Sequence, residues 1–202
     1  MHKEIGSCGD SAIATLQANV TIPEGMGIEG YWKAECRDKN GNLKWVEEFP
    51  NLVVAVGKQL MLDTLLRTSG TYTTTGPFLG LTNATLTPAA TDTMTTLVGG
   101  GKEFTAYTVG GSAVRGTAVF AASSSSGSTP SNVTTSTATA ITYTITGAGG
   151  TVYGCFLVLG SGAVSTQSNT GGTLYSEGNF STAKVTTAGD TVCVTYSTTA
   201  TS

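Results

Sequence analysis

The segments on either side of Asn40-Gly41 constrain the fold more than any other feature of the chain. Before this pair, every second residue is apolar, at Trp32, Ala34 and Cys36. After it, apolar residues return at Leu43, Trp45 and Phe49, until Pro50-Asn51 interrupts the pattern. Asn-Gly supplies the two positive φ angles that a tight hairpin turn requires. The pattern predicts an antiparallel β-hairpin within residues 29–54.

Short extended segments recur through the rest of the chain. Strands are predicted at 78–81, 103–109, 113–121, 138–146, 152–159, 181–186 and 191–197. Residues 155–159 (CFLVL) are apolar on both faces, which is typical of a central strand covered on two sides. The serine- and threonine-rich stretch 123–137 is interpreted as a surface loop.

One segment has helical spacing. Leu60, Met61, Thr64 and Leu65 share a face, which predicts a helix at about 56–67 with Met61 as a core residue. Elsewhere threonine, serine and glycine dominate, and only 11% of residues are charged, against roughly 25% in typical soluble domains. These residues are poor helix formers and suit strands joined by turns.

We therefore expect an all-β fold, an antiparallel β-sandwich or jelly-roll-like domain with one helix at about 56–67. Residues 29–202 are expected to form this single domain. Residues 1–28 are expected to be an N-terminal arm or a peripheral strand, because only 15–22 alternate there.

Charge and hydropathy exclude two classes of partner. The net charge is −3 and no cluster of lysine or arginine occurs, so a nucleic-acid partner is not expected. No basic amphipathic helix or run of about 20 apolar residues points to a membrane. The N-terminus lacks an apolar signal region, so we expect synthesis in a cytoplasm without an export signal.

The residues that enzymes use are sparse and scattered. His2, the single histidine, lies at a chain end, which argues against Ser–His or Cys–His machinery. Glu47 and Glu48 are adjacent on a strand, so they point to opposite faces, and we interpret both as solvated. A glycosidase would need two converging carboxylates. The carboxylates beyond residue 70 each lie next to a turn or loop, and no pattern pairs them: Asp92, Glu103, Glu177 and Asp190.

Three motifs have a structural interpretation that we prefer to a functional one. The spacing of Asp38, Asn40 and Asn42 departs from a calcium loop in its glycine and in its twelfth residue, so the hairpin turn is favoured. Residues 99–102 (GGGK) lack the flanking residues of a phosphate loop. Cysteines 8, 36, 155 and 193 have no metal-ligand spacing, and the last three are predicted to be free and buried on apolar faces. We therefore expect no catalytic, cofactor or metal residues, no cofactor and no enzyme activity.

The chain resembles a group of small structural proteins of tailed bacteriophages, of the decoration, cement or head-fibre type. The resemblance lies in residues 30–35 (GYWKAE), 38–45 (DKNGNLKW), 49–54 (FPNLVV), 57–63 (GKQLMLD), 78–81 (FLGL), 172–180 (GTLYSEGNF) and 188–196 (AGDTVCVTY). It implies a virion protein of β-sandwich type and carries no catalytic residues.

Two functions follow from this resemblance. The first is a capsid decoration protein on the outer surface of the phage head, with the major capsid protein and copies of itself as partners, trimers included. The second is a tail-associated fibre or adhesin that binds a host-surface glycan or protein. In the second case an aromatic platform would stack on sugars, unless its members are half-buried strand residues: Tyr72, Tyr107, Tyr153 and Tyr175.

Overall fold

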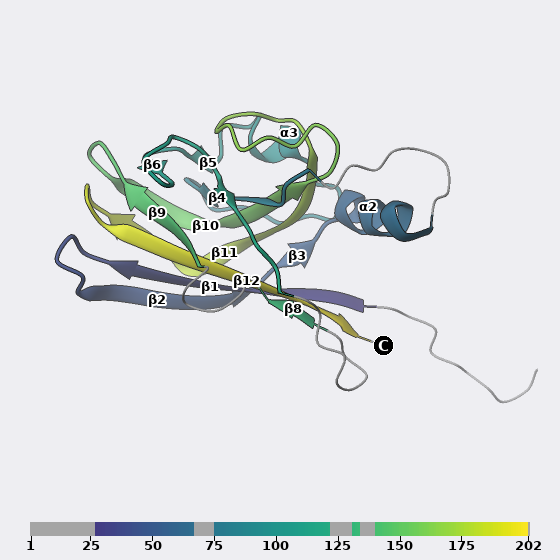
Figure 1. The fold of residues 1–202 in the computed structure, drawn as a ribbon, viewed down its shortest axis with the longest axis horizontal. Coiled ribbons are helices and arrows are strands. Elements are labelled where there is room, and N and C mark those ends of the chain that lie inside the picture. Colours follow the sequence, from purple (N-terminus) through teal and green to yellow (C-terminus); the bar gives the residue numbers. More distant parts are fainter. Residues whose placement is uncertain (1–26, 67–74, 122–130, 134–139, 202) are drawn as a thin grey trace, which may run out of the picture.

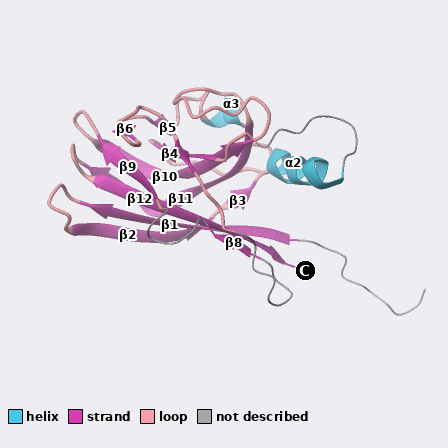
Figure 2. Ribbon diagram, viewed as in Figure 1, coloured by secondary structure: helices cyan, strands magenta, loops and turns pink. Residues whose placement is uncertain are grey.

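Two antiparallel sheets lie face to face, as Figures 1 and 2 show. The computed structural model describes residues 27–66, 75–121, 131–133 and 140–201. Sheet A has the order β2-β1-β12-β9-β6, with β8 beside β12, and sheet B the order β3-β11-β10-β4-β5, with β7 beside β4. The expected all-β sandwich is therefore confirmed.

The strands of sheet A are β1 (Gly27–Arg37), β2 (Leu43–Pro50), β6 (Tyr107–Thr108), β8 (Ser131–Val133), β9 (Ile141–Ile145) and β12 (Thr191–Thr201). Those of sheet B are β3 (Leu52–Val53), β4 (Phe78–Thr82), β5 (Glu103–Phe104), β7 (Gly116–Thr117), β10 (Gly150–Leu159) and β11 (Thr173–Thr186). β1 starts at Gly27, while the predicted strand at 15–22 and the rest of the arm lie outside the described residues.

The predicted hairpin is confirmed as β1 and β2. Trp32, Ala34 and Cys36 are fully buried. The predicted pair of positive φ angles is wrong for Asn40: Gly41 has φ +86°, but Asn40 has no positive φ. The turn is wider than a two-residue Asn-Gly turn, because the Gly41 N–H donates to the Asp38 carbonyl. Leu43 is the exception, because its side chain is 53% exposed. A register shift between Cys36 and Arg37 interrupts the pairing at that end of the hairpin, so the predicted alternation does not extend to Leu43.

Replacing Gly41 with valine is expected to destabilise the fold by about 1–3 kcal/mol, because a β-branched residue tolerates positive φ poorly. A Cβ at this position would meet no atom within 4 Å, so the cost comes from the backbone angle alone. Urea unfolding measures it, with Gly41→Asn as the control because asparagine accepts this conformation more readily. Equal stability of Gly41→Val and the parent protein would contradict the turn.

β10 is the central strand that its apolar run predicts, because it lies between β4 and β11. Cys155 and Leu157 pack into the core between the sheets, whereas Phe156 and Val158 pack on the opposite face of sheet B. A short helix, α3 (Met94–Leu97), and the neighbouring loops cover that face. Sheet B is thus buried on both faces.

The predicted helix is α2 (Ala55–Leu66), one residue earlier than expected, and it lies against β11. Gly57 permits this contact, since a Cβ there would lie 2.6 Å from the Tyr175 carbonyl oxygen. Met61 packs against the core as predicted, and its sulfur accepts a hydrogen bond from the Tyr175 hydroxyl. Thr64 was predicted on the buried face but is exposed, and its hydroxyl donates to the Leu60 carbonyl. No helix in the described ranges is long and apolar enough to cross a membrane.

Several predicted strands have different limits in the structure. The segment 103–109 divides into β5 in sheet B and β6 in sheet A, and 113–121 contains only the two-residue β7. The segment 181–186 is the end of β11, which starts at Thr173. The stretch 123–137, interpreted as a loop, contains β8; its remaining residues are outside the described part of the chain.

Candidate functional site

The four carboxylates beyond residue 70 occupy three separate sites. Asp92 and Glu177 come together, whereas Glu103 pairs with Arg115 and Asp190 pairs with Lys44. Sequence spacing does not predict any of these pairs, because each joins segments that meet only when the sheets assemble.

Asp92 and Glu177 share a hydrogen bond on the outer face of sheet B. Glu177 lies on β11 and is 1% exposed, while Asp92 precedes α3. Burial, the hydrogen bond to Asp92 and the negative charge of Asp92 raise the pKa of Glu177 to about 8. The pKa of Asp92 is lowered: burial opposes this, but hydrogen bonds from Glu177, the Ala89 N–H and Thr96 outweigh it. At neutral pH Glu177 is therefore the proton donor and Asp92 the carboxylate.

A carboxyl–carboxylate pair of this kind can perform acid–base chemistry when a substrate reaches it. Here the adjoining cavity measures about 10 Å³, which leaves room for no more than about one water molecule. Its walls are Leu86, Thr87, Asp92, Thr96, Leu97, Lys102 and Glu177. The pair therefore holds the loop before α3 against β11 and offers no substrate site.

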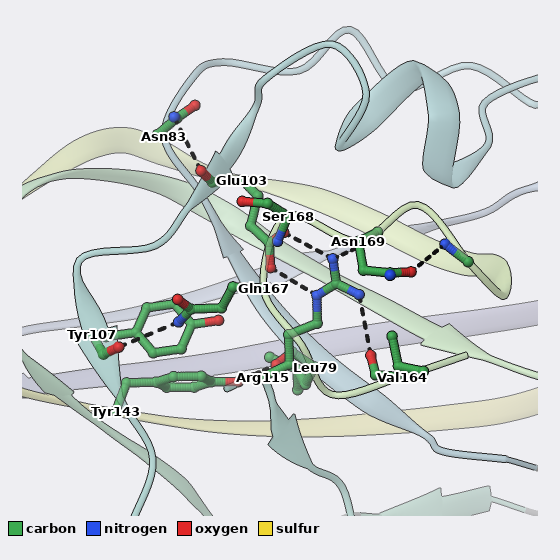
Figure 3. A network of polar contacts seen from close by, with 11 residues as sticks. Leu79, Asn83, Glu103, Tyr107, Arg115, Tyr143, Val164, Gln167, Ser168 and Asn169 are labelled. Carbon is green, nitrogen blue, oxygen red and sulfur yellow. Dashed lines mark hydrogen bonds and ion pairs between the residues drawn. The ribbon is translucent and has the colours of Figure 1, made fainter. Parts of the chain in front are cut away.

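Arg115 and Glu103 form a buried ion pair, drawn in Figure 3. Arg115 is 1% exposed, and its Nε and one terminal nitrogen donate to the two Glu103 carboxylate oxygens at 2.7 and 2.8 Å. The guanidinium also donates to the carbonyls of Val164 and Asn169, while Glu103 accepts from the Ser168 N–H. Because three of these contacts reach residues of the 160–172 loop, the pair fastens that loop to β5 and to the start of β7.

The remaining charged pairs lie at the hairpin. Glu48 is exposed and bonds Lys33, as predicted for a solvated side chain. Glu47 was also predicted to be solvated, but it is 9% exposed and points into the sandwich. It bonds Lys184 at 2.8 Å and accepts from the Ser181 N–H at 2.7 Å, because the alternation of β2 turns it toward β11.

Neither the calcium-loop motif at 38–42 nor the glycine-rich motif at 99–102 has the geometry that its ligand would require. The Asp38 carboxylate accepts from the N–H groups of Asn40 and Asn42 and from the Asn42 amide, so the turn itself uses both oxygens. Residues 99–101 follow α3 instead of preceding a helix. Among the described residues, no group of three histidine, cysteine, aspartate or glutamate side chains is placed to hold a metal ion.

The three described cysteines are free, and they differ in how deeply they are buried. Cys36 and Cys155 are free and buried, and burial raises the pKa of both thiols. Cys193 is free but only half-buried, which corrects its predicted place on an apolar face: Val192 and Val194 take the buried positions of β12. His2 and Cys8 lie outside the described residues.

The described tyrosines of the suggested platform are buried or half-buried, in agreement with their interpretation as strand residues. Tyr107 and Tyr175 are buried and Tyr153 is half-buried, whereas Tyr72 is outside the described residues. The tyrosine with the largest exposure among those described is Tyr31, at 43%. The sequence indicates this exposure, because the alternation of β1 places Tyr31 with Glu29 and Lys33 on the face opposite Trp32.

The outer face of sheet A around Tyr31 carries two hollows. Each has a volume of about 210 Å³, and they share Tyr31 and Ser197 as walls. No protein-family model, curated protein or solved structure matches this chain. The assignment of function therefore rests on the chain's own residues.

Proposed function

We propose that this is a virion structural protein, a capsid decoration or cement protein that binds the outer surface of a tailed-phage head in many copies. Its partners are the major capsid protein and further copies of itself, trimers included, and the binding needs no nucleic acid, membrane or cofactor. It is made in the host cytoplasm and acts in the particle, without enzyme activity.

The observation that carries the proposal is that the two segments resembling phage structural proteins are neighbours in the fold. Residues 30–63 form most of β1, then β2, β3 and most of α2, and residues 172–196 form β11 and the first part of β12. β1 pairs with β12 along its whole length, and β3 and α2 both lie against β11. Segments more than a hundred residues apart thus make one structural unit, which supports a resemblance in fold over a chance likeness of short motifs.

The surface is compatible with dense packing of many copies. Outward positions of β9 and β12 are largely threonine and serine, and the exposed pairs Lys33–Glu48 and Arg37–Glu35 cancel much of the charge on β1 and β2. A weakly charged surface reduces repulsion between neighbouring copies. β1 starts beside the end of β12, so Gly27, the first described residue, lies at one end of sheet A (Figure 1).

A specific observation also favours the second function, a tail-associated fibre or adhesin that binds a host-surface glycan or protein. The two hollows beside Tyr31 give the protein a recognition surface that attachment to a shell does not require.

Purified protein added to shells that lack it is expected to bind saturably and to sediment with them. A variant that starts at Gly27 is expected to keep the circular dichroism of the sandwich but to lose most of this binding, because an arm that orders on a neighbour contributes main-chain pairing. Cosedimentation measures both proteins in parallel. Failure of the full chain to bind shells opposes the head assignment, and equal binding by the shortened chain opposes the role of the arm.

A further inference from the structure

The two faces of the sandwich differ in what covers them. The outer face of sheet B carries an apolar cluster and the Asp92–Glu177 pair, and it lies beneath α3 and the loops around it. The outer face of sheet A carries polar side chains, and Tyr31 is the aromatic residue that stands among them. Outward positions of β1 run Glu29, Tyr31, Lys33, so the tyrosine has a carboxylate on one side and an ammonium on the other.

The hollows lie in line along β1, with Tyr31 between them. The first is lined by Glu29, Gly30, Tyr31, Pro50, Asn51, Ser197 and Thr199. The second is lined by Tyr31, Lys33, Glu48, Thr195, Tyr196 and Ser197. Hydroxyl, amide and carboxyl groups thus surround an exposed aromatic ring on both sides.

Asn51 supplies a polar group that the fold itself does not satisfy. Its Nδ2 donates to the Tyr196 hydroxyl at 2.7 Å, and its main-chain N–H donates to the Gly30 carbonyl. Its Oδ1 is buried, and no donor among the described residues reaches it. Gly30 leaves the space that this arrangement needs, because a Cβ there would collide with both Asn51 and Tyr196. The Asn51 amide therefore faces the interior beside Tyr196, and its Oδ1 is closed to a ligand. The polar side chains that line the first hollow on the side of Tyr31 are those of Glu29, Ser197 and Thr199.

The chemistry of these walls selects one class of ligand. A phosphate or polyanion is disfavoured, because Lys33 is the single cation in the walls and Glu48 already pairs with it at 2.8 Å. A peptide strand could pair only with the free edge of β2, because β1 already pairs with β2 and β12, so it would not fill the hollows that lie along β1. A sugar ring fits both features, since its C–H face packs on an aromatic ring and its hydroxyls donate and accept hydrogen bonds.

We propose that the outer face of sheet A binds a neutral saccharide, with one sugar ring on Tyr31 and its hydroxyls bonded by Glu29, Ser197 and Thr199. The second hollow, beside Glu48 and Ser197, receives the next sugar unit. This site rests on the second proposed function and names its ligand class, while the first proposed function is tested separately by binding to shells. Many copies on one particle would turn a weak single site into firm attachment.

A nuclear magnetic resonance titration of the full chain tests the site with cellotriose, maltotriose, mannotriose and chitotriose as probes. At least one probe is expected to shift the amide signals of residues 29–33 and 195–199, with a Kd of about 1 mM. Tyr31→Ala is expected to weaken that binding roughly tenfold, whereas Tyr31→Phe keeps the ring and stays within about threefold of the parent. Tyr153→Ala, on sheet B, is the control for loss of a tyrosine elsewhere.

Three results would overturn the proposal: no shift on this face with any of the four probes, unchanged binding by Tyr31→Ala, or binding only of dextran sulfate in a salt-dependent manner. The last result would identify an anion site instead. Because the titration uses isolated protein, its failure leaves the shell-binding result unaffected.

Discussion

Replacing Arg115 with methionine is expected to lower the free energy of unfolding by about 3–5 kcal/mol, because it leaves the Glu103 carboxylate buried without its cation. The substitution also removes the donors of the Val164 and Asn169 carbonyls, which hold the 160–172 loop. Urea unfolding followed by the fluorescence of Trp32 and Trp45 measures the loss.

The matched control is Lys33→Met, which removes the cation of an exposed pair and is expected to change the stability little, because solvent screens that pair. A second variant, Arg115→Met with Glu103→Gln, is expected to recover part of the loss, because no buried charge remains. Recovery stays incomplete since the two loop carbonyls still lack their donors. If Arg115→Met costs no more than Lys33→Met, the buried pair does not stabilise the fold as described.

The second prediction with a large effect is that the free energy of unfolding depends on pH through Glu177. The pKa of Glu177 is raised from its ordinary value of 4.5 to about 8. Between these two pH values the folded state holds a proton that the unfolded state releases, so stability falls as pH rises. The slope is about 1.4 kcal/mol per pH unit for one proton, which amounts to a few kcal/mol across the window.

Glu177→Gln is expected to remove this slope, because the amide still donates to Asp92 but does not titrate. Urea unfolding at pH 5, 6, 7 and 8 compares the two proteins, with Glu48→Gln as a control on the exposed hairpin. Asp92, Asp190 and Glu47 have lowered pKa values, so their contributions are lost at acidic pH, below this window. A Glu177→Gln protein with the parent's slope would show that Glu177 is not the titrating group.

The elements predicted correctly from sequence are those whose pattern is local. The hairpin follows from alternation about Asn40-Gly41, and β10 from an apolar run that needs cover on both faces. α2 follows from helical spacing, although the exposure of Thr64 depends on how the helix meets β11.

The elements predicted incorrectly depend on contacts between distant segments. Residues 103–109 alternate like one strand, but the Tyr107 N–H bonds the Thr105 carbonyl, and the chain crosses from sheet B to sheet A at that turn. The first half of β11 was missed because Ser176 and Glu177 are polar yet buried. Their burial depends on partners such as Asp92, which sequence spacing does not reveal. The hollows beside Tyr31 likewise form only when β1, β2 and β12 are side by side.

The number of copies of this protein in a purified particle tests the central claim most directly. Quantitative mass spectrometry against the major capsid protein gives that number. A decoration protein on a symmetric shell is expected on the order of hundreds of copies per particle, in a fixed ratio to the major capsid protein. A handful of copies, or copies that separate with the tails when particles are disrupted, would contradict the head assignment.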